Sequence, residues 1–546
     1  MLFQREEPIT ATEIDRRIQE WKRCASARAP LGIVRDPGYK PGMRVRRGHL
    51  RKVGVVAWCA ALAVVLLMAG CGDDEDESAM NGAPRVRGVI EGFYGPPYTF
   101  DQRRDLFRFL PAAGLNTYAY APKDDPFHRD QWRDPYPSEY VEHFRELAAI
   151  GGEIGVRFVF TIAPGLTFDP ATDDLHILQQ KLASLLSVDV RDFCLLFDDI
   201  AAGRPGADPE VQADIVTEVS HFLRGRDPGA SLWFISNYYA GTAEELANDQ
   251  SPFRFLFSIP SSAYYAAYTR IPADVPVMWT GPAVFSERLT RAEAQKFRAF
   301  AGRPVVVWDN YPANDALVSR ELFLGPYQGR EPGLGEVLDG VLANLMLQPE
   351  AAKIPLWTIG RLFAQGDAYD PWQAWEDALQ TVSNGRGTDA LRTLAQQFQS
   401  HPFIGDADES PEFAAAADDF FRTRSPSSRS TLRGLLESFA RNRNELQTDL
   451  GNAALASELL EPSTKLSLLG EAGLVALDLL AQKESGLGVD VGPLEEKLAA
   501  AARIPWLVGA NTSVGSALAG LVANREAKRA DVFADFFGRV LSELGR

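Results

Sequence analysis

Eight short apolar runs, separated by helical patterns, constrain the fold of this chain more than any other feature of its sequence. Apolar runs of this length are typical of parallel strands that are buried on both faces. Between them lie segments with apolar residues at helical spacing, such as 99–113 and 138–150. Eight strand–helix units over about 270 residues predict an α/β fold, a (β/α)₈ TIM barrel. The runs lie near residues 85–93, 116–121, 157–163, 192–197, 231–236, 275–280, 304–309 and 338–344.

Two parts of the sequence depart from this alternation. The segment 238–274 is irregular and aromatic, so the pattern does not place its helix. After residue 370 the strands stop, polar loops are expected at 405–411 and 423–430, and amphipathic helical stretches follow. We predict a helical bundle there. The helical stretches lie near 430–448, 463–482, 491–503 and 526–543.

Polar and aromatic side chains follow seven of the eight runs, at the carboxyl end of each predicted strand. In a TIM barrel these strand ends form the rim where active sites lie. Carboxylates and amides bind hydroxyl groups and an indole stacks on a sugar ring, so this rim predicts a carbohydrate pocket. The rim residues are Glu91-Gly92-Phe93-Tyr94, Lys123-Asp124-Asp125, Asp198-Asp199, Asn237-Tyr238-Tyr239, Trp279-Thr280-Gly281, Trp308-Asp309-Asn310 and Asn344.

Asp198 and Asp199 directly follow the fourth run, which ends at Phe197. Two unpaired charges are costly to bury, which favours an open strand end for both. Carboxylates held close together cannot both ionise freely, so we expect one raised and one low pKa, as glycoside hydrolysis requires. A helix cap or a solvated turn is the structural alternative. Strand alternation adds a condition, because both side chains face the pocket only if the strand ends or bulges there.

Four other rim residues also have structural alternatives. Lys123 could pair at the surface with Asp124 or Asp125. Trp308 and Trp279 could be core aromatics, and Trp279 is expected in the core. Strand alternation turns Asp309 away from its neighbours and from the pocket.

Charge and cysteine content narrow the class of ligand. The formal net charge of −17 argues against nucleic acid as a partner. Cys24, Cys59 and Cys71 lie in the N-terminal segment, and Cys194 is the remaining cysteine. This distribution gives neither a disulfide framework nor a zinc-binding spacing. We therefore expect no metal and no cofactor, and the sequence does not predict the oligomeric state.

The N-terminal segment has the features of a lipoprotein export signal. Basic residues from Arg44 to Lys52 precede a charge-free run, Val53 to Gly70, that ends at Cys71. This order resembles a bacterial lipoprotein signal peptide, in which the cysteine is lipidated and becomes the new N-terminus. We expect an exported protein of the bacterial cell envelope, anchored to a membrane through Cys71. A single spanning helix is the alternative, since the run is of borderline length.

These patterns together predict the domain organisation. Residues 1–42 precede a second methionine, Met43, and are assigned no fold. The expected parts are an N-terminal extension with a signal peptide at 1–71, an acidic linker at 72–84, a catalytic barrel at 85–369 and a helical domain at 370–546.

Six motifs of the barrel region resemble those of glycoside hydrolase family 84, the β-N-acetylglucosaminidases that include O-GlcNAcases and some proteins called hyaluronidases. They occur in the family's order within residues 85–365. Members of the family fold as (β/α)₈ barrels followed by a helical domain, so the resemblance implies that fold here. The motifs are GVIEGFYGPPYTFDQR (88–103), LNTYAYAPKDD (115–125), LLFDDI (195–200), MWTGP (278–282), WDNYPANDA (308–316) and LFLGPYQGR (322–330).

The resemblance also implies a reaction. The enzyme would hydrolyse terminal β-linked GlcNAc with retention, and the substrate's own 2-acetamido oxygen would form an oxazoline intermediate. Asp198 would polarise the acetamido N–H, and Asp199 would protonate the leaving oxygen and then activate water. The substrate-binding residues implied are Gly92 and Lys123 for sugar hydroxyls, Tyr94 in the same motif as Gly92, Tyr239 for the acetamido oxygen, Trp308 as the wall of the acetamido pocket, Asn310 at the reacting centre, and Asp315 and Asn344 for the far hydroxyls of a terminal sugar.

One strand end departs from the family's pattern. The fifth strand ends in Ser236-Asn237-Tyr238-Tyr239, where the family often has a Pro-Thr-Glu-Tyr-like end. The preference for the aglycone is therefore left open.

Two alternative functions fit parts of the sequence. One is a glycan-binding lipoprotein without turnover, which the intact Asp-Asp pair disfavours. The other is a metal-dependent hydrolase that uses the carboxylates Asp124, Asp125, Asp198 and Asp199. The expected partner is a GlcNAc-containing glycan or glycoconjugate, and hyaluronidase-like activity is less expected than O-GlcNAcase-like activity.

Overall fold

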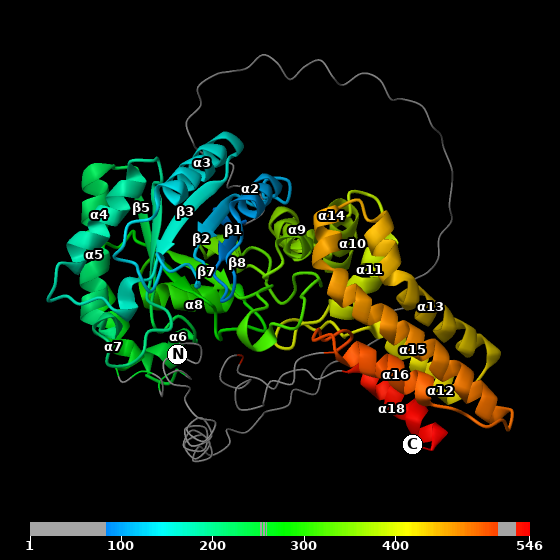
Figure 1. Ribbon diagram of the computed structural model, residues 1–546. Coiled ribbons are helices and arrows are strands. Elements are labelled where there is room, and N and C mark those ends of the chain that lie inside the picture. Colours follow the sequence, from blue (N-terminus) through cyan, green and yellow to red (C-terminus); the bar gives the residue numbers. More distant parts are fainter. Residues whose placement is uncertain are drawn as a thin grey trace, which may run out of the picture. The chain divides into compact units, whose positions relative to one another are not determined.

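The computed structural model describes residues 83–545, apart from 252–253, 255–256, 258, 511–522 and 524–530. Its eight parallel strands pair in sequence order, and β1 pairs with β8 to close a barrel (Figure 1). Each strand lies within one of the predicted runs, so the predicted TIM barrel is confirmed. The strands are β1 (Val86–Glu91), β2 (Thr117–Tyr120), β3 (Arg157–Ile162), β4 (Asp192–Leu196), β5 (Ser231–Ile235), β6 (Val277–Trp279), β7 (Val305–Asp309) and β8 (Gly340–Asn344).

Side-chain alternation along the strands builds two apolar layers. In β4, Cys194 and Leu196 point into the barrel, where they join a compact interior cluster. Phe193 and Leu195 point outward and pack under the surrounding helices. Both faces of the strand are therefore buried, which explains why the runs read as continuously apolar.

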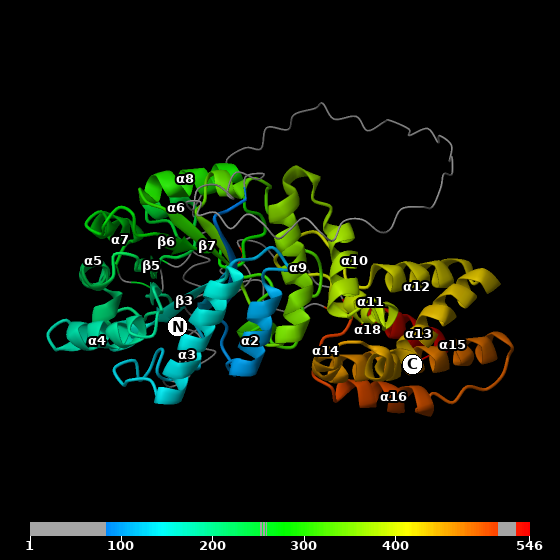
Figure 2. The ribbon, with the colours of Figure 1, turned by 90° about the horizontal axis from the view of Figure 1, so that it is seen from above.

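Helices surround the barrel (Figures 1 and 2). Thr99 begins α2 with a capping box, because its side chain accepts from the backbone of Gln102 and Gln102 bonds back to Thr99. Asp208 caps the N-terminus of α5, where its side chain accepts from the backbone N–H groups of Glu210 and Val211. These helices are α2 (Phe100–Phe109), α3 (Ser138–Ile154), α4 (Asp174–Leu186), α5 (Pro209–Arg226), α6 (Ala243–Ala247), α7 (Ser261–Tyr268), α8 (Arg291–Ala301) and α9 (Pro349–Gln365).

The chain after α9 is helical, with α13 and α15 side by side (Figures 1 and 2). Gly470 and Gly473 allow this close packing, since a Cβ at Gly470 would lie 2.5 Å from the backbone nitrogen of Ala440. The loop predicted at 423–430 is wrong beyond Ser425, which caps α13 and lets Pro426 begin it. The helices are α10 (Pro371–Val382), α11 (Thr388–Ala395), α12 (Pro411–Thr423), α13 (Pro426–Asp449), α14 (Ala453–Glu458), α15 (Leu460–Glu484), α16 (Gly492–Ala502) and α18 (Val532–Leu544).

The predicted signal peptide and Cys71 lie outside the described residues, as does most of the acidic linker. Within the described residues, no helix combines the length and apolar character needed to cross a bilayer. The division into domains stays a prediction.

Candidate active site

Asp198 and Asp199 lie just past the end of β4 and point to different partners. The strand stops at Leu196, and Asp199 adopts a left-handed backbone with φ of 57°. This break ends the alternation, so adjacent side chains can serve the same pocket. The side chain of Asp198 is 8% exposed, and Asp208 provides the cap of α5. The two residues form a turn in which Asp198 is buried and Asp199 half-buried, and neither caps a described helix.

Asp198 has one satisfied and one unsatisfied oxygen. Lys123 Nζ donates to Asp198 Oδ2 in an ion pair whose two side chains are 3% and 8% exposed. Among the described residues, the buried Asp198 Oδ1 has no hydrogen-bond partner. A buried carboxylate oxygen without a donor is costly, so it marks a position suited to an N–H or O–H of a ligand. The surface pairing of Lys123 with Asp124 or Asp125 is wrong.

Asp199 accepts hydrogen bonds from two tyrosines. Tyr94 Oη donates to Asp199 Oδ2 at 2.7 Å, and Tyr239 Oη donates to Asp199 Oδ1 at 3.0 Å. Burial and the nearby Asp199 charge raise the pKa of both tyrosines well above the usual value. Both hydroxyls therefore remain protonated donors at neutral pH.

The charges around Asp199 act in opposite directions on its proton. The pKa of the Asp199 carboxyl lies below its usual value: burial raises it, whereas Lys123, Arg129 and the hydrogen bond from Tyr94 lower it. A carboxyl group with a clearly raised pKa lies in the neighbouring loop. Burial raises the pKa of Asp315 to about 6, against the lowering effect of the Tyr94 N–H, which donates to its Oδ2 at 2.6 Å.

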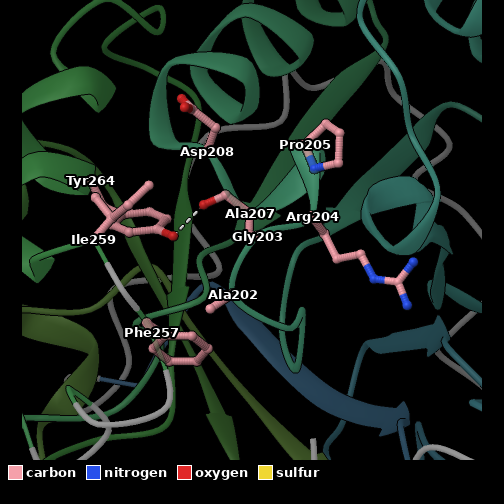
Figure 3. A pocket seen from close by; sticks show the side chains of 9 residues that line it. All are labelled: Ala202, Gly203, Arg204, Pro205, Ala207, Asp208, Phe257, Ile259 and Tyr264. Carbon is pink, nitrogen blue, oxygen red and sulfur yellow. Dashed lines mark hydrogen bonds between the residues drawn. The ribbon is translucent and has the colours of Figure 1, made fainter. Parts of the chain in front are cut away.

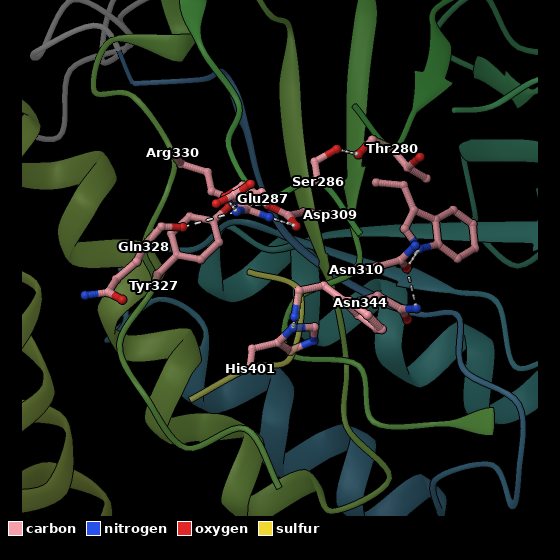
Figure 4. A network of polar contacts seen from close by, with 12 residues as sticks. Thr280, Ser286, Glu287, Asp309, Asn310, Tyr327, Gln328, Arg330, Asn344 and His401 are labelled. Atoms are coloured by element: carbon pink, nitrogen blue, oxygen red, sulfur yellow. Dashed lines mark hydrogen bonds and ion pairs between the residues drawn. The ribbon is translucent and has the colours of Figure 1, made fainter. Parts of the chain in front are cut away.

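The other side of the site consists of an indole and two amides (Figure 4). Trp308 Nε1 donates to Asn310 Oδ1 at 3.0 Å, and Asn344 Nδ2 donates to the same oxygen at 3.0 Å. Gly92 N–H donates to Asn344 Oδ1 at 3.1 Å. A Cβ at Gly92 would lie 2.2 Å from Cζ2 of Trp308, so the indole requires glycine there. Lys123 Nζ lies 5.2 Å from the Trp308 ring centre and connects the indole to Asp198.

All ten predicted barrel-site residues are thus connected through direct contacts or the short Gly92–Tyr94 segment. They come from the ends of β1, β2, β4, β5, β7 and β8 and the loops that follow, at the carboxyl rim of the barrel. The set is Gly92, Tyr94, Lys123, Asp198, Asp199, Tyr239, Trp308, Asn310, Asp315 and Asn344. Its members offer carboxylates, amides, hydroxyls and an indole, which together can bind a sugar and move a proton.

Asp309 turns away from the site, as alternation predicts (Figure 4). Its carboxylate accepts from Arg330 Nε at 2.7 Å and Nη2 at 2.6 Å, and from Tyr327 Oη at 2.5 Å. The Arg330 side chain is fully buried. A bidentate pair of this kind fixes the β7 end between Trp308 and Asn310. Trp279 lies in the core, with its ring stacked 4.3 Å from that of Phe297.

Sequence reasoning missed two arginines that contact this region, Arg330 and Arg129. Arg330 ends the motif LFLGPYQGR, and Arg129 follows the Lys123-Asp124-Asp125 strand end in the same loop. Their place in or beside the motifs was the one available signal, because neither follows a strand directly. Arg129 Nη1 donates to Tyr94 Oη at 2.9 Å.

The four aspartates proposed for a metal centre do not gather. Asp125 accepts from Tyr120 Oη and Tyr136 Oη, each at 2.7 Å, and Asp124 is exposed. Within the described part of the chain, no group of three or more histidine, cysteine, aspartate or glutamate side chains is arranged to hold a metal ion. The geometry therefore does not support the metal-dependent alternative.

A separate cleft of about 280 Å³ lies beside the loop that follows Asp199 (Figure 3). Tyr264 Oη donates to the carbonyl of Ala207 at its wall. None of the predicted site residues lines it. The lining residues are Ala202, Gly203, Arg204, Pro205, Ala207, Asp208, Phe257, Ile259 and Tyr264.

Comparison with known proteins identifies the family. A family model described as beta-N-acetylglucosaminidase matches residues 87–396. The chain is 36% identical over 301 residues to proteins named Protein O-GlcNAcase from Rattus norvegicus and Mus musculus, a match that covers 53% of this chain and 31% of each relative. The chain thus spans about a third of the length of these relatives.

Structural comparison agrees with the sequence match. A solved structure of a mutant O-GlcNAc hydrolase from Thermobaculum terrenum has a TM-score of 0.69 and 26% identity to this chain. The match covers 84% of this chain and 95% of that one. The chain therefore belongs to the β-N-acetylglucosaminidase family, glycoside hydrolase family 84.

Proposed function

We propose that the protein is a retaining exo-β-N-acetylglucosaminidase that removes terminal β-linked GlcNAc by substrate-assisted catalysis. The observation that carries this proposal is the arrangement of Asp198, whose Oδ2 is held by Lys123 while its buried Oδ1 has no partner among the described residues. Oδ1 can accept a hydrogen bond from an acetamido N–H. Such a bond increases the negative charge on the acetamido oxygen and makes it a better nucleophile.

In the first step the acetamido oxygen attacks the anomeric carbon, and the bond from that carbon to the leaving oxygen breaks. Asp199 gives its proton to the leaving oxygen, and Asp198 stabilises the positive charge that develops on the oxazoline nitrogen. In the second step Asp199, now a carboxylate, takes a proton from water. The water oxygen attacks the anomeric carbon, the oxazoline opens, and the two inversions give net retention.

The remaining site residues would hold a terminal sugar. Asp315 and Asn344 would bind the far hydroxyls, together with Gly92 at the floor and the cation of Lys123. Trp308 would form the wall of the acetamido pocket beside Asn310, whose oxygen already orients the indole N–H. Contacts to a terminal ring support exo action, because a further sugar on that side would need the same space.

Tyr239 would donate to the acetamido oxygen in the substrate complex. In this structure its hydroxyl donates to Asp199 Oδ1. A shift of that donor to the substrate would leave Asp199 Oδ1 to face the leaving oxygen. Ser236 and Asn237, which depart from the family's pattern, make hydrogen bonds inside the fold. Asn237 Nδ2 donates to the carbonyl of Ile200, and Tyr268 Oη donates to Ser236 Oγ.

The proposed ligand is a GlcNAc-bearing glycan or glycoconjugate. The names of the mammalian relatives and the bacterial hydrolase support an O-GlcNAc-like linkage. We also propose that the protein is exported and lipid-anchored at Cys71, on the basis of its sequence.

Hydrolysis of an aryl 2-acetamido-β-glucoside by purified protein tests the function. We expect turnover, retention of configuration by proton NMR, and a strong loss of rate when the acetamido group is replaced by trifluoroacetamido, because the fluorines weaken the nucleophilic oxygen. Asp124→Asn, at an exposed neighbour in a rim loop, is the matched control and should keep full activity.

Each alternative has its own outcome in this assay. Binding of the glycoside without turnover would favour a glycan-binding protein. Loss of activity with a chelator would favour the metal-dependent hydrolase. An inverted product would contradict the substrate-assisted mechanism.

A further inference from the structure

Arg129 is a buried cation that bonds to a tyrosine of the site. It lies in the loop between β2 and α3, is 5% exposed, and donates from Nη1 to Tyr94 Oη at 2.9 Å. Its guanidinium carbon lies 5.4 Å from the centre of the Tyr94 ring. No ion pair within 4.0 Å joins Arg129 to a carboxylate of the described residues, and its buried Nη2 has no hydrogen-bond partner there. A buried cation is costly in this position unless neighbouring negative charges stabilise it.

Tyr94 connects this cation to Asp199. The hydroxyl oxygen accepts from Arg129, and its single proton is donated to Asp199 Oδ2 at 2.7 Å. A cation that donates to a hydroxyl oxygen polarises the O–H bond and strengthens the bond that this hydroxyl donates. Because the pKa of Tyr94 is raised by burial, the tyrosine keeps its proton and transmits charge without transferring it.

The loop that carries Arg129 is fixed from several sides. Lys181 Nζ donates to three of its carbonyls, those of Phe127, Trp132 and Asp134. The chain directly after β3 also contacts the loop, since Ala163 N–H donates to the carbonyl of His128 at 3.0 Å. Such over-determined anchoring is expected for a charge whose position matters.

We propose that Arg129 is a positioning residue that controls the acid strength of Asp199 through the hydroxyl of Tyr94. This inference rests on the proposed function, in which Asp199 gives a proton to the leaving oxygen and later takes one from water. With Oδ2 held by the Arg129–Tyr94 pair, Oδ1 is the oxygen that exchanges its proton with the substrate. The titratable and charged groups facing Asp199 are Asp198, Lys123, Arg129, Tyr94, Tyr239 and Asp315.

The sign of the effect follows from the charge. Removal of the guanidinium makes the Asp199 carboxylate less stable and raises its pKa. The limb of the kcat/KM pH profile that Asp199 governs should therefore move to higher pH. We expect a shift of about one unit, the lower end of the range for one nearby opposite charge.

The test compares Arg129→Gln with wild type on two substrates. An alkyl or phenyl GlcNAc glycoside requires the acid, whereas a dinitrophenyl glycoside does not, so the limb present with the first and missing with the second belongs to Asp199. We expect that limb to shift in Arg129→Gln and in Tyr94→Phe, with no further shift when the two changes are combined. In Arg129→Lys, which keeps the cation, the limb should lie closer to its wild-type pH than to its pH in Arg129→Gln. Arg145→Gln, at an exposed arginine of α3, should leave the profile unchanged.

Four results would overturn the inference. A uniform loss of rate with an unmoved limb would mean that Arg129 only supports the fold, which thermal unfolding of each variant would report separately. A shift of the limb in Arg129→Gln without one in Tyr94→Phe would show that Arg129 does not act on Asp199 through the Tyr94 hydroxyl. If wild type does not hydrolyse either glycoside, the proposed function fails and this inference fails with it. A normal wild-type profile with an unshifted Arg129→Gln contradicts the inference alone.

Discussion

At the scale of single residues, Asp198 and Asp199 are chain neighbours with different partners. Asp198 pairs with Lys123, and Asp199 accepts from two tyrosines. If Asp199 is the acid, Asp199→Asn should be crippled on an alkyl or protein-linked sugar yet keep much of its rate of intermediate formation with a dinitrophenyl leaving group, which departs unaided. Asp198→Asn should be slow on both substrates, by ~10²–10⁴, because Asp198 acts on the nucleophilic acetamido group and not on the leaving group. Pre-steady-state kinetics on both substrates measures this.

A stable mimic of the intermediate provides a second measurement for these variants. A thiazoline should bind wild type tightly and Asp198→Asn poorly, because the pocket is complementary to the oxazoline state. Equal dependence on the leaving group in the two variants would contradict the assigned roles.

Asp315 predicts a pH dependence of both activity and stability. Its pKa is raised by burial to about 6, so the ionised acceptor that would hold sugar hydroxyls prevails only above that pH. Asp315→Asn should lose at least about tenfold in kcat/KM on N-acetylglucosaminides, since a bond to a charged acceptor contributes ~1.5–3 kcal/mol. With the dinitrophenyl substrate, the wild-type kcat/KM profile should have a limb near pH 6 that is missing from the profile of Asp315→Asn.

The stability arm of this prediction has a definite sign. A carboxyl group whose pKa is raised by folding stabilises the protein fully below the pKa of the unfolded chain, about 4, and loses that contribution as pH rises through 6. The melting temperature of Asp315→Asn should therefore rise relative to that of wild type as the pH increases from 4 to 8. An unchanged kcat/KM would remove Asp315 from the site.

The sequence predicted which residues form the site better than it predicted their contacts. Chemistry-bearing side chains at strand ends, such as Trp308 and Asn344, meet at the rim because the barrel topology brings strand ends together. Lys123 could not be assigned to Asp198 in advance, since loop conformation decides which carboxylate it meets. Arg129 lies deeper in the same loop, where no strand periodicity applies.

At the scale of elements, the end of β1 depends on the absence of a side chain. A Cβ at Gly92 would overlap the Trp308 indole, and the Gly92 N–H orients Asn344. Gly92→Ala should displace the indole and lower kcat/KM by ~10²-fold, the usual effect of misplacing a site group by about 1 Å. The strain should also lower the free energy of unfolding by ~1–3 kcal/mol. Steady-state kinetics and chemical denaturation check both.

A matched glycine provides the control for this change. Gly434 lies within α13, and a Cβ there would meet nothing within 4 Å. Gly434→Ala should leave activity intact and stabilise the protein by ~0.5–1 kcal/mol through helix propensity. Full activity in Gly92→Ala would show that the indole can relax without affecting the sugar site.

Element prediction succeeded where periodicity was strong and failed where aromatic residues replaced it. All eight strands lie within their predicted runs because each is apolar on both faces. In 238–274 the short helices α6 and α7 show no amphipathic pattern, since Tyr264, Tyr265 and Tyr268 are all buried. Pro426 concealed the start of α13, because a proline reads equally well as a loop residue and as a first helical residue.

At the scale of the whole molecule, long-range polar contacts join α9 and the segment between β7 and β8 to the helices that follow α9. The Glu458 carboxylate accepts from the backbone N–H groups of Glu350 and Ala351, at 3.1 Å and 2.9 Å. It thereby satisfies donors at the start of α9. Trp375 Nε1 donates to the carbonyl of Leu324 at 2.6 Å. Contacts between residues 51 or more positions apart leave no periodic trace, so the sequence could predict these helices but not how they attach.

The same scale includes the N-terminal segment, where the charge-free run 53–70 ends at Cys71. The first strand begins at Val86, so cleavage before Cys71 would leave every strand of the barrel intact. Removal of the predicted export signal should therefore leave the barrel intact, and the predicted anchor at Cys71 can be tested separately from the barrel.

Wild-type protein expressed in a bacterium that processes lipoproteins should begin at a lipidated Cys71 and partition with membranes. Cys71→Ala should accumulate as the uncleaved precursor, because the lipid is attached to that thiol before the signal is removed. A chain that begins at residue 72 should be found in the aqueous fraction with unchanged kcat/KM, since it retains the whole barrel. Intact-mass analysis and detergent phase partition measure these outcomes, and wild-type protein that retains residues 53–70 would favour a spanning helix instead.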